Sequence, residues 1–113
     1  MVNTVKYLSA TTLIGDEVKN LEGESVGHLK EIMLNTGAGK ISYAVLSFGG
    51  VLGMGDKLFA VPWESLMVDH LDKKLVLNVR KDRLKDAPGF DKNNWPNFAD
   101  PAFAQTLNSY YTH

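Results

Sequence analysis

The sequence predicts a mainly β protein: a small antiparallel β-barrel of about six short strands with a short C-terminal helical extension. Turn signals recur at close spacing between Asp16 and Arg80, and the segments between them are rich in β-branched and aromatic residues. Apolar residues fall on both alternating faces of these segments, which favours a closed or nearly closed barrel. With 113 residues, 44% of them hydrophobic and 22% charged, the chain fits one globular domain.

Two long strands are expected in the first half of the chain. Residues 25–36 (SVGHLKEIMLNT) follow a turn and carry apolar side chains on mixed parity, which is typical of a strand with a bulge. Residues 40–48 (KISYAVLSF) have apolar side chains on both faces. One face holds Ile41, Tyr43 and Val45, and the other holds Ala44, Leu46 and Phe48. Both faces of this strand are therefore expected to be partly buried.

The later strands are shorter. Residues 57–63 (KLFAVPW) predict a strand near whose end Trp63 joins the core, and residues 64–68 (ESLMV) continue the sheet. The cleanest alternation of apolar and polar side chains occurs in residues 74–80 (KLVLNVR). Leu77, in the middle of that segment, is expected to be a core side chain.

The pattern changes after Arg80. Residues 81–90 (KDRLKDAPGF) allow one short helical turn, and residues 91–98 (DKNNWPNF) have the composition of a loop. Asp100 then provides an N-cap and Pro101 the first position of a short amphipathic helix. Its apolar residues at helical spacing are Phe103, Leu107, Tyr110 and Tyr111.

Residues 47–66 (SFGGVLGMGDKLFAVPWESL) contain four glycines close together, a density that raises the question of a phosphate-binding loop. Such a loop needs a strand before it and a helix after it, because the helix N-terminus supplies amide donors. Here a strand is predicted to follow, and the glycine spacing matches no phosphate-binding pattern. The segment is therefore predicted to be a long hairpin whose glycines permit positive φ and close backbone approach.

Residues able to carry catalysis or bind a metal are few and unfavourably spaced. The chain has no cysteine, and His28, His70 and His113 form no pair at the short spacing of a helical zinc site. Ser65 lacks the sequence context of a hydrolase nucleophile. The acidic residues cluster around turns, where a solvated surface explains them. The sequence thus predicts no catalytic, cofactor-binding or metal-binding residue, and no enzyme activity.

Charge and hydropathy narrow the range of partners. Twelve basic and thirteen acidic residues give a formal net charge of −1, which provides no positive field for a nucleic-acid backbone. No apolar run is long enough for a signal peptide or a membrane span. The lack of cysteine fits a reducing compartment. We therefore expect a cytoplasmic protein with neither nucleic acid nor a membrane as its main partner.

The order of motifs along the chain resembles the PRC-barrel domain family. The first motif, G-x-x-V-x-x-x-x-G-x-x-V-G, spans residues 15–27, and the second, V-P-W-x-x-L, spans residues 61–66. The resemblance covers residues 10–84 as a barrel domain and leaves residues 85–113 as an extension with a short helix. The chain is similar to stand-alone bacterial members of the family.

This resemblance implies a small antiparallel β-barrel that serves as an assembly or interaction module. In the photosynthetic reaction-centre H subunit the domain packs against membrane subunits, and in the ribosome maturation factor RimM it contacts a ribosomal protein. This sequence contains neither the transmembrane helix of the former nor the N-terminal domain of the latter. Neither specific role is therefore expected to transfer to it.

Two functions are compatible with these observations. The first is a non-catalytic module that binds a protein partner or a second copy of itself as a homodimer. Its predicted contact residues are Val51, Leu52, Met54, Trp95, Phe98, Tyr110 and Tyr111. In a monomeric arrangement, the C-terminal helix instead covers its own barrel through Phe103 and Leu107. The alternative function is a small-molecule-binding protein or enzyme with a pocket at the barrel mouth, lined by Tyr43, Trp63 and His70.

Overall fold

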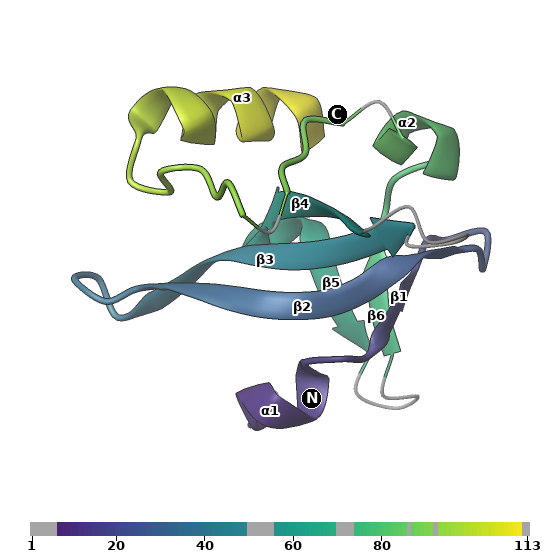
Figure 1. The fold of residues 1–113 in the computed structure, drawn as a ribbon. Coiled ribbons are helices and arrows are strands. Elements are labelled where there is room, and N and C mark those ends of the chain that lie inside the picture. The colour runs from purple at the N-terminus through teal and green to yellow at the C-terminus, as the bar shows by residue number, and fades with distance from the viewer. Residues whose placement is uncertain (1–6, 50–55, 70–73, 86, 92, 112–113) are drawn as a thin grey trace.

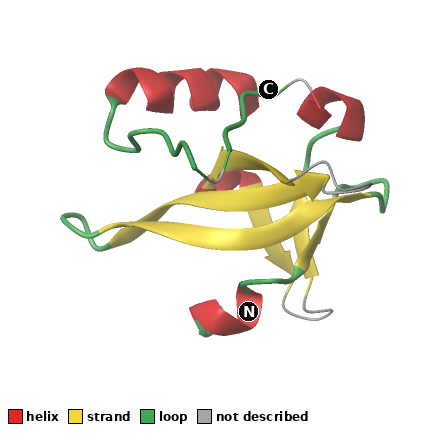
Figure 2. Cartoon of the chain, viewed as in Figure 1, coloured by secondary structure: helices red, strands yellow, loops and turns green. Residues whose placement is uncertain are grey.

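A computed structural model describes residues 7–49, 56–69, 74–85, 87–91 and 93–111 (Figure 1). The six strands of the described chain are β1 (Glu17–Lys19), β2 (Ser25–Asn35), β3 (Lys40–Gly49), β4 (Asp56–Pro62), β5 (Leu66–Asp69) and β6 (Lys74–Leu77). The helices are α1 (Ala10–Leu13), the 3₁₀ turn η2 (Trp63–Ser65), α2 (Lys81–Lys85) and α3 (Pro101–Tyr111). Figure 2 shows α1, α2 and α3 around the strands. The predicted mainly β class, the six strands and the C-terminal helix are confirmed.

The strands form one mixed sheet in the order β4-β3-β2-β1-β6-β5. All neighbours are antiparallel except β1 and β6, which run parallel with Val18 opposite Leu75. The edge strands β4 and β5 do not pair with each other within the described residues. The prediction of a closed, fully antiparallel barrel is therefore wrong in both respects, because the sheet is open and contains one parallel pair.

The chain itself explains why the sheet stays open between β4 and β5. β4 ends at Pro62, which has no backbone N–H to donate, and the chain then enters the turn η2. β5 follows this turn and pairs with β6, where Leu66 lies opposite Leu77. β6 in turn lies beside β1, so that β4 and β5 are the two edge strands of the described sheet. The parallel β1–β6 contact joins segments far apart in sequence, so no local hairpin signal specifies its direction.

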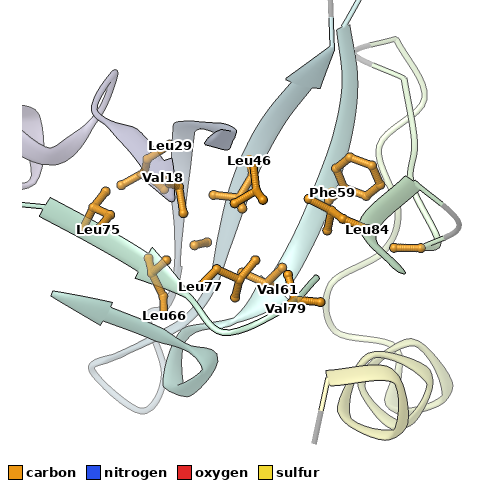
Figure 3. Close-up of a cluster of buried hydrophobic side chains, with 13 residues drawn as sticks. Val18, Leu29, Leu46, Phe59, Val61, Leu66, Leu75, Leu77, Val79 and Leu84 are labelled. Atoms are coloured by element: carbon orange, nitrogen blue, oxygen red, sulfur yellow. The ribbon is translucent and has the colours of Figure 1, made fainter. Parts of the chain in front are cut away.

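The main hydrophobic core lies between the two halves of this bent sheet. In Figure 1, β5 and β6 cross behind β2 and β3 at a steep angle. Figure 3 shows side chains from both halves pointing into the space between them. The inner cluster consists of Val18, Val26, Leu29, Ala44, Leu46, Phe59, Val61, Leu66, Leu75, Leu77, Val79, Leu84 and Ala87. Leu77 is 1% exposed, and the partly buried Trp63 packs against this cluster, as predicted.

A second, smaller core lies on the opposite face of β3 and β4. The outer cluster has three buried residues, Tyr43, Ala60 and Leu107. Leu107 belongs to α3, which lies over this face of the sheet (Figure 1). The partly buried residues packed against it are Met33, Phe90, Phe98, Phe103 and Tyr111. The prediction that both faces of β3 are partly buried is confirmed, because the sheet covers one face and α3 covers the other.

The first family motif ends at a close approach between β2 and β3. Gly27 has a φ of 125°, and a Cβ atom there would collide with the carbonyl oxygen of Ser47. Only glycine fits this position, because it has no Cβ and adopts positive φ readily. Further along the same strand pair, the register shifts between Leu29 and Glu31. The predicted bulge in this strand is therefore confirmed.

The glycine-rich segment connects two antiparallel strands. Gly49 at the end of β3 lies opposite Asp56 at the start of β4. The element that follows the glycines is thus a strand, and the strand-to-helix context of a phosphate-binding loop is not present here. Residues 50–55, which include the predicted contact residues Val51, Leu52 and Met54, lie outside the described residues.

Candidate interaction surface

The C-terminal extension is attached to the edge of the sheet at Phe90. The N–H of Leu58 in β4 donates to the carbonyl of Phe90 (3.0 Å), and the N–H of Phe90 donates to the carbonyl of Leu58 (2.8 Å). Glycine at position 89 permits this approach, because a Cβ there would meet the Lys57 side chain and the Leu58 carbonyl. The outer edge of β4 is thereby covered at this point.

Aromatic rings on both sides of this attachment form a continuous aromatic cluster. Its members are Tyr43, Phe90, Trp95, Phe98 and Phe103. The Phe98 ring centroid lies 5.4 Å from that of Tyr43 and 5.5 Å from that of Phe103. The Trp95 centroid lies 5.1 Å from that of Phe90, and tilted contacts of this kind are favourable for aromatic pairs. Because Trp95 stays 38% exposed, part of the cluster faces solvent.

Asp100 starts the helix that completes this cluster. Its Oδ1 accepts a hydrogen bond from the N–H of Ala102 (3.0 Å), and its carbonyl accepts one from the N–H of Ala104 (3.2 Å). This is the predicted N-cap, with Pro101 at the first helical position. The cap fixes the start of α3, so that Phe103 and Leu107 face the sheet.

Exposed apolar side chains continue from the aromatic cluster onto the β2–β3 hairpin. Leu34 in β2 lies opposite Ile41 in β3, one pair from the turn. Leu34 is 64% exposed and Ile41 is 36% exposed. In Figure 1 this hairpin extends well beyond the rest of the sheet. Ile41 was predicted to lie on the same face as Tyr43, but the exposure of this pair was not predicted, because a strand pattern does not show where neighbouring strands end.

A groove separates the hairpin from the loop before α3. It has a volume of about 300 Å³ and is lined by Met33, Leu34, Asn35, Thr36, Ser42, Tyr43, Phe98 and Ala99. Tyr43 and Phe98 provide aromatic lining, while Leu34 leaves most of its surface in solvent. Apolar side chains exposed together in this way are typical of binding surfaces. We call this groove, with Ile41 and Trp95, the hairpin surface.

The two tyrosines predicted as contact residues pack against their own chain. Tyr110 and Tyr111 are partly buried at the end of α3, and their ring centroids lie 5.1 Å apart. Tyr111 contacts both the inner and the outer cluster. Its hydroxyl is buried and has no hydrogen-bond partner in the described chain. Burial raises the pKa of Tyr111 above its ordinary value, with a further contribution from Tyr110.

An open hollow of about 630 Å³ lies where η2 meets the end of α3. It is lined by Pro62, Glu64, Ser65, Met67, Asn78, Asn108 and Tyr111. Of the residues predicted to line a barrel-mouth pocket, Tyr43 faces the outer cluster and Trp63 packs against the inner one. Burial raises the pKa of Tyr43, and the charge of Glu64 adds to this effect. His70, the third predicted residue, lies outside the described residues, as does His113.

Two further sequence expectations concern chemistry. His28 is exposed on β2. Within the described residues, no three side chains of His, Cys, Asp or Glu gather closely enough to hold a metal ion.

Of the seven predicted contact residues, Trp95 and Phe98 lie at the hairpin surface, and Tyr110 and Tyr111 lie at the far end of α3.

These features define a small β-sheet module with a helical cover and an apolar surface open to solvent. Residues 6–84 match the PRC-barrel domain in a scan against protein families, and the chain therefore belongs to this family. The resemblance drawn from its motifs is confirmed. No curated protein matches the chain. Among the helices that the structure describes, none has the length and apolar character needed to cross a membrane.

Proposed function

We propose that this chain is a non-catalytic protein-interaction or assembly module that binds through the hairpin surface. The observation that carries this proposal is the exposure of Leu34, Ile41 and Trp95 beside an aromatic-lined groove. Apolar side chains gathered at one face are costly in water and favour burial against a partner. Aromatic residues are also enriched among the side chains that dominate binding energy.

The family and the sequence support a binding role over catalysis. PRC-barrel domains generally serve in assembly, and the barrel domain was predicted over residues 10–84, close to the family match. The predicted division from residues 85–113, the cytoplasmic location and the exclusion of nucleic acid remain predictions. A second predicted contact region consists of Val51, Leu52 and Met54 in the glycine-rich segment. A small-molecule function at the η2 hollow is less favoured, because that hollow is open to solvent rather than enclosed.

Affinity purification from the native cell, followed by mass spectrometry, tests the proposed function. A tagged wild-type chain is compared with Ile41→Lys and Trp95→Lys, which place a charge in the hairpin surface. Leu21→Lys is the matched control, because Leu21 is 63% exposed in the turn between β1 and β2. We expect wild type and the control to co-purify with a specific protein, which can be an untagged copy of this chain. Neither hairpin-surface variant should retain that protein. Identical protein sets for all four chains would contradict the proposal.

A further inference from the structure

The tip of the β2–β3 hairpin is a two-stranded projection. Pairing of β3 with β4 ends at Tyr43, and pairing of β2 with β1 ends at His28. The Leu34–Ile41 and Asn35–Lys40 pairs therefore have strand neighbours only in each other within the described sheet. Two-stranded hairpins are marginally stable in water without further packing. An exposed apolar pair at such a position is stabilised when another surface covers it.

The hairpin projects beside a groove that has the corresponding chemistry. The apolar pair forms a ridge, and the neighbouring groove presents Tyr43 and Phe98. The ridge and the groove lie side by side, with Leu34 belonging to both. A two-fold axis between two copies places the ridge of each copy in the groove of the other. Such an interface uses one surface twice and closes, so it forms no open-ended polymer.

The charges around the groove are also self-complementary. Lys40 is exposed at the hairpin, opposite Asn35, which lines the groove. Asp100 is exposed on the other side, next to the groove residue Ala99. In the described part of the chain, neither Lys40 nor Asp100 forms an ion pair. Docking of each hairpin in the groove of the other copy would bring these opposite charges together. The net charge of −1 adds little repulsion between the copies.

We propose that the occupant of the hairpin surface is a second copy of this chain. The two copies form a two-fold dimer in which the β2–β3 hairpin of each docks in the groove of the other. This inference rests on the proposed function and names the partner of the same surface. Leu34 and Ile41 of each copy contact the groove of the other, and Lys40 of each copy approaches Asp100 of the other. The dimer differs from one formed by the tail of α3, because Tyr110 and Tyr111 keep their contacts within one chain.

Sedimentation equilibrium of the full chain tests the dimer directly. We expect wild type to dimerise in the micromolar range, and Leu34→Lys or Ile41→Lys to weaken dimerisation at least tenfold. Leu21→Lys is again the matched control and should dimerise like wild type. Lys40→Glu should weaken the dimer, and added salt should reduce the difference between Lys40→Glu and wild type. A wild-type chain that is monomeric at about 100 μM overturns the proposal, as does a dimer insensitive to both hairpin variants.

A cross-linking experiment keeps the proposal testable if a lysine variant fails to fold. Because the chain has no cysteine, a single introduced thiol reports its position without interference. Chains carrying Lys40→Cys are mixed with chains carrying Ala99→Cys under mild oxidation. We expect a mixed disulfide to form much faster than in a control mixture of Lys40→Cys with Leu21→Cys chains. Equal rates in the two mixtures overturn the dimer geometry.

The outcomes separate this inference from the proposed function. If the wild-type chain is monomeric and Ile41→Lys abolishes its binding of a different protein, the dimer is wrong and the proposed interaction module stands. If the wild-type chain is monomeric and the same proteins co-purify with the hairpin-surface variants, both the dimer and the proposed interaction module are wrong.

Discussion

Arg83 in α2 and Tyr110 near the end of α3 hold each other by three contacts. The guanidinium carbon of Arg83 lies 4.2 Å from the centroid of the Tyr110 ring. Nη2 of Arg83 donates to the backbone carbonyl of Tyr110 (2.6 Å), and the Tyr110 hydroxyl donates to the backbone carbonyl of Arg83. A cation at the carboxyl end of a helix also interacts favourably with its dipole. This pair therefore fastens the end of α3 to the segment that follows the sheet.

Replacing Arg83 is expected to loosen the C-terminal helix. Arg83→Ala should lower the free energy of unfolding by about 1–3 kcal/mol, because it removes a charge-assisted hydrogen bond from a partly buried site. Arg83→Lys should recover part of this, since lysine keeps the charge but not the planar fork. Arg80→Ala is the control: its pair with Asp82 (2.8 Å) is exposed, and its loss should leave stability unchanged. Urea unfolding measures all three, and equal effects of Arg83→Ala and Arg80→Ala would contradict the role of the pair.

The glycines of the first family motif should differ in their tolerance of alanine. Gly27→Ala is expected to cost at least about 2 kcal/mol, because it combines positive φ with a collision against the Ser47 carbonyl. Gly23→Ala should cost about 1 kcal/mol, because Gly23 has a φ of 84° but open space around its Cβ position. Thermal or urea unfolding measures the difference between the two variants, to which the collision and the larger φ of Gly27 both contribute. If they lose equal stability, the close approach of β2 and β3 is unimportant.

Local sequence signals predicted most of the strands, because alternation reports burial within one segment. The bulged strand, both faces of β3, Leu77 in the core and the capped helix α3 were all predicted and are confirmed. Strand direction and closure were not predictable in the same way. The pairing of Val18 with Leu75 depends on the path of the chain between them, which no alternation pattern encodes.

The candidate surface was predicted only in part, for a similar reason. Trp95 and Phe98 stood out as aromatic residues outside the strands, and they belong to the aromatic cluster. Leu34 and Ile41 were seen as ordinary strand residues, because their exposure depends on β4 and β1 ending before the hairpin does. The buried Asn20 was also missed. Its Oδ1 accepts hydrogen bonds from the N–H groups of Glu22 (3.1 Å) and Glu24 (2.9 Å) and shapes the turn before β2.

The buried hydroxyl of Tyr111 should make stability depend on alkaline pH. Its pKa is raised in the folded chain, so above about pH 10 the unfolded chain loses this proton while the folded chain keeps it. The unfolded state is then favoured progressively, and wild type should lose stability as the pH rises through this value. Tyr111→Phe should reduce that loss. It should also raise stability at neutral pH by about 1 kcal/mol, because the hydroxyl lacks a partner in the described chain.

Tyr7→Phe is the matched control for this measurement, because Tyr7 is 89% exposed. It should unfold like wild type in urea at both neutral and alkaline pH. A pH profile of Tyr111→Phe identical to that of wild type would show that the hydroxyl ionises equally easily in both states.

Because the only buried residue described in α3, Leu107, belongs to the small outer cluster, α3 is predicted to open before the sheet unfolds. Leu107 is 1% exposed between Tyr43 and Ala60, and these three are the only buried members of the outer cluster among the described residues. Leu107→Ala should therefore weaken the attachment of α3 by about 2–5 kcal/mol, so that its amides exchange hydrogen more than tenfold faster. Amides of β6, whose Leu75 and Leu77 lie in the inner cluster, should change much less. Gln105→Ala, at an exposed position of the same helix, should leave both sets of amides unchanged. Hydrogen exchange read by mass spectrometry distinguishes the two regions, and equal acceleration in α3 and β6 would mean that the clusters unfold as one unit.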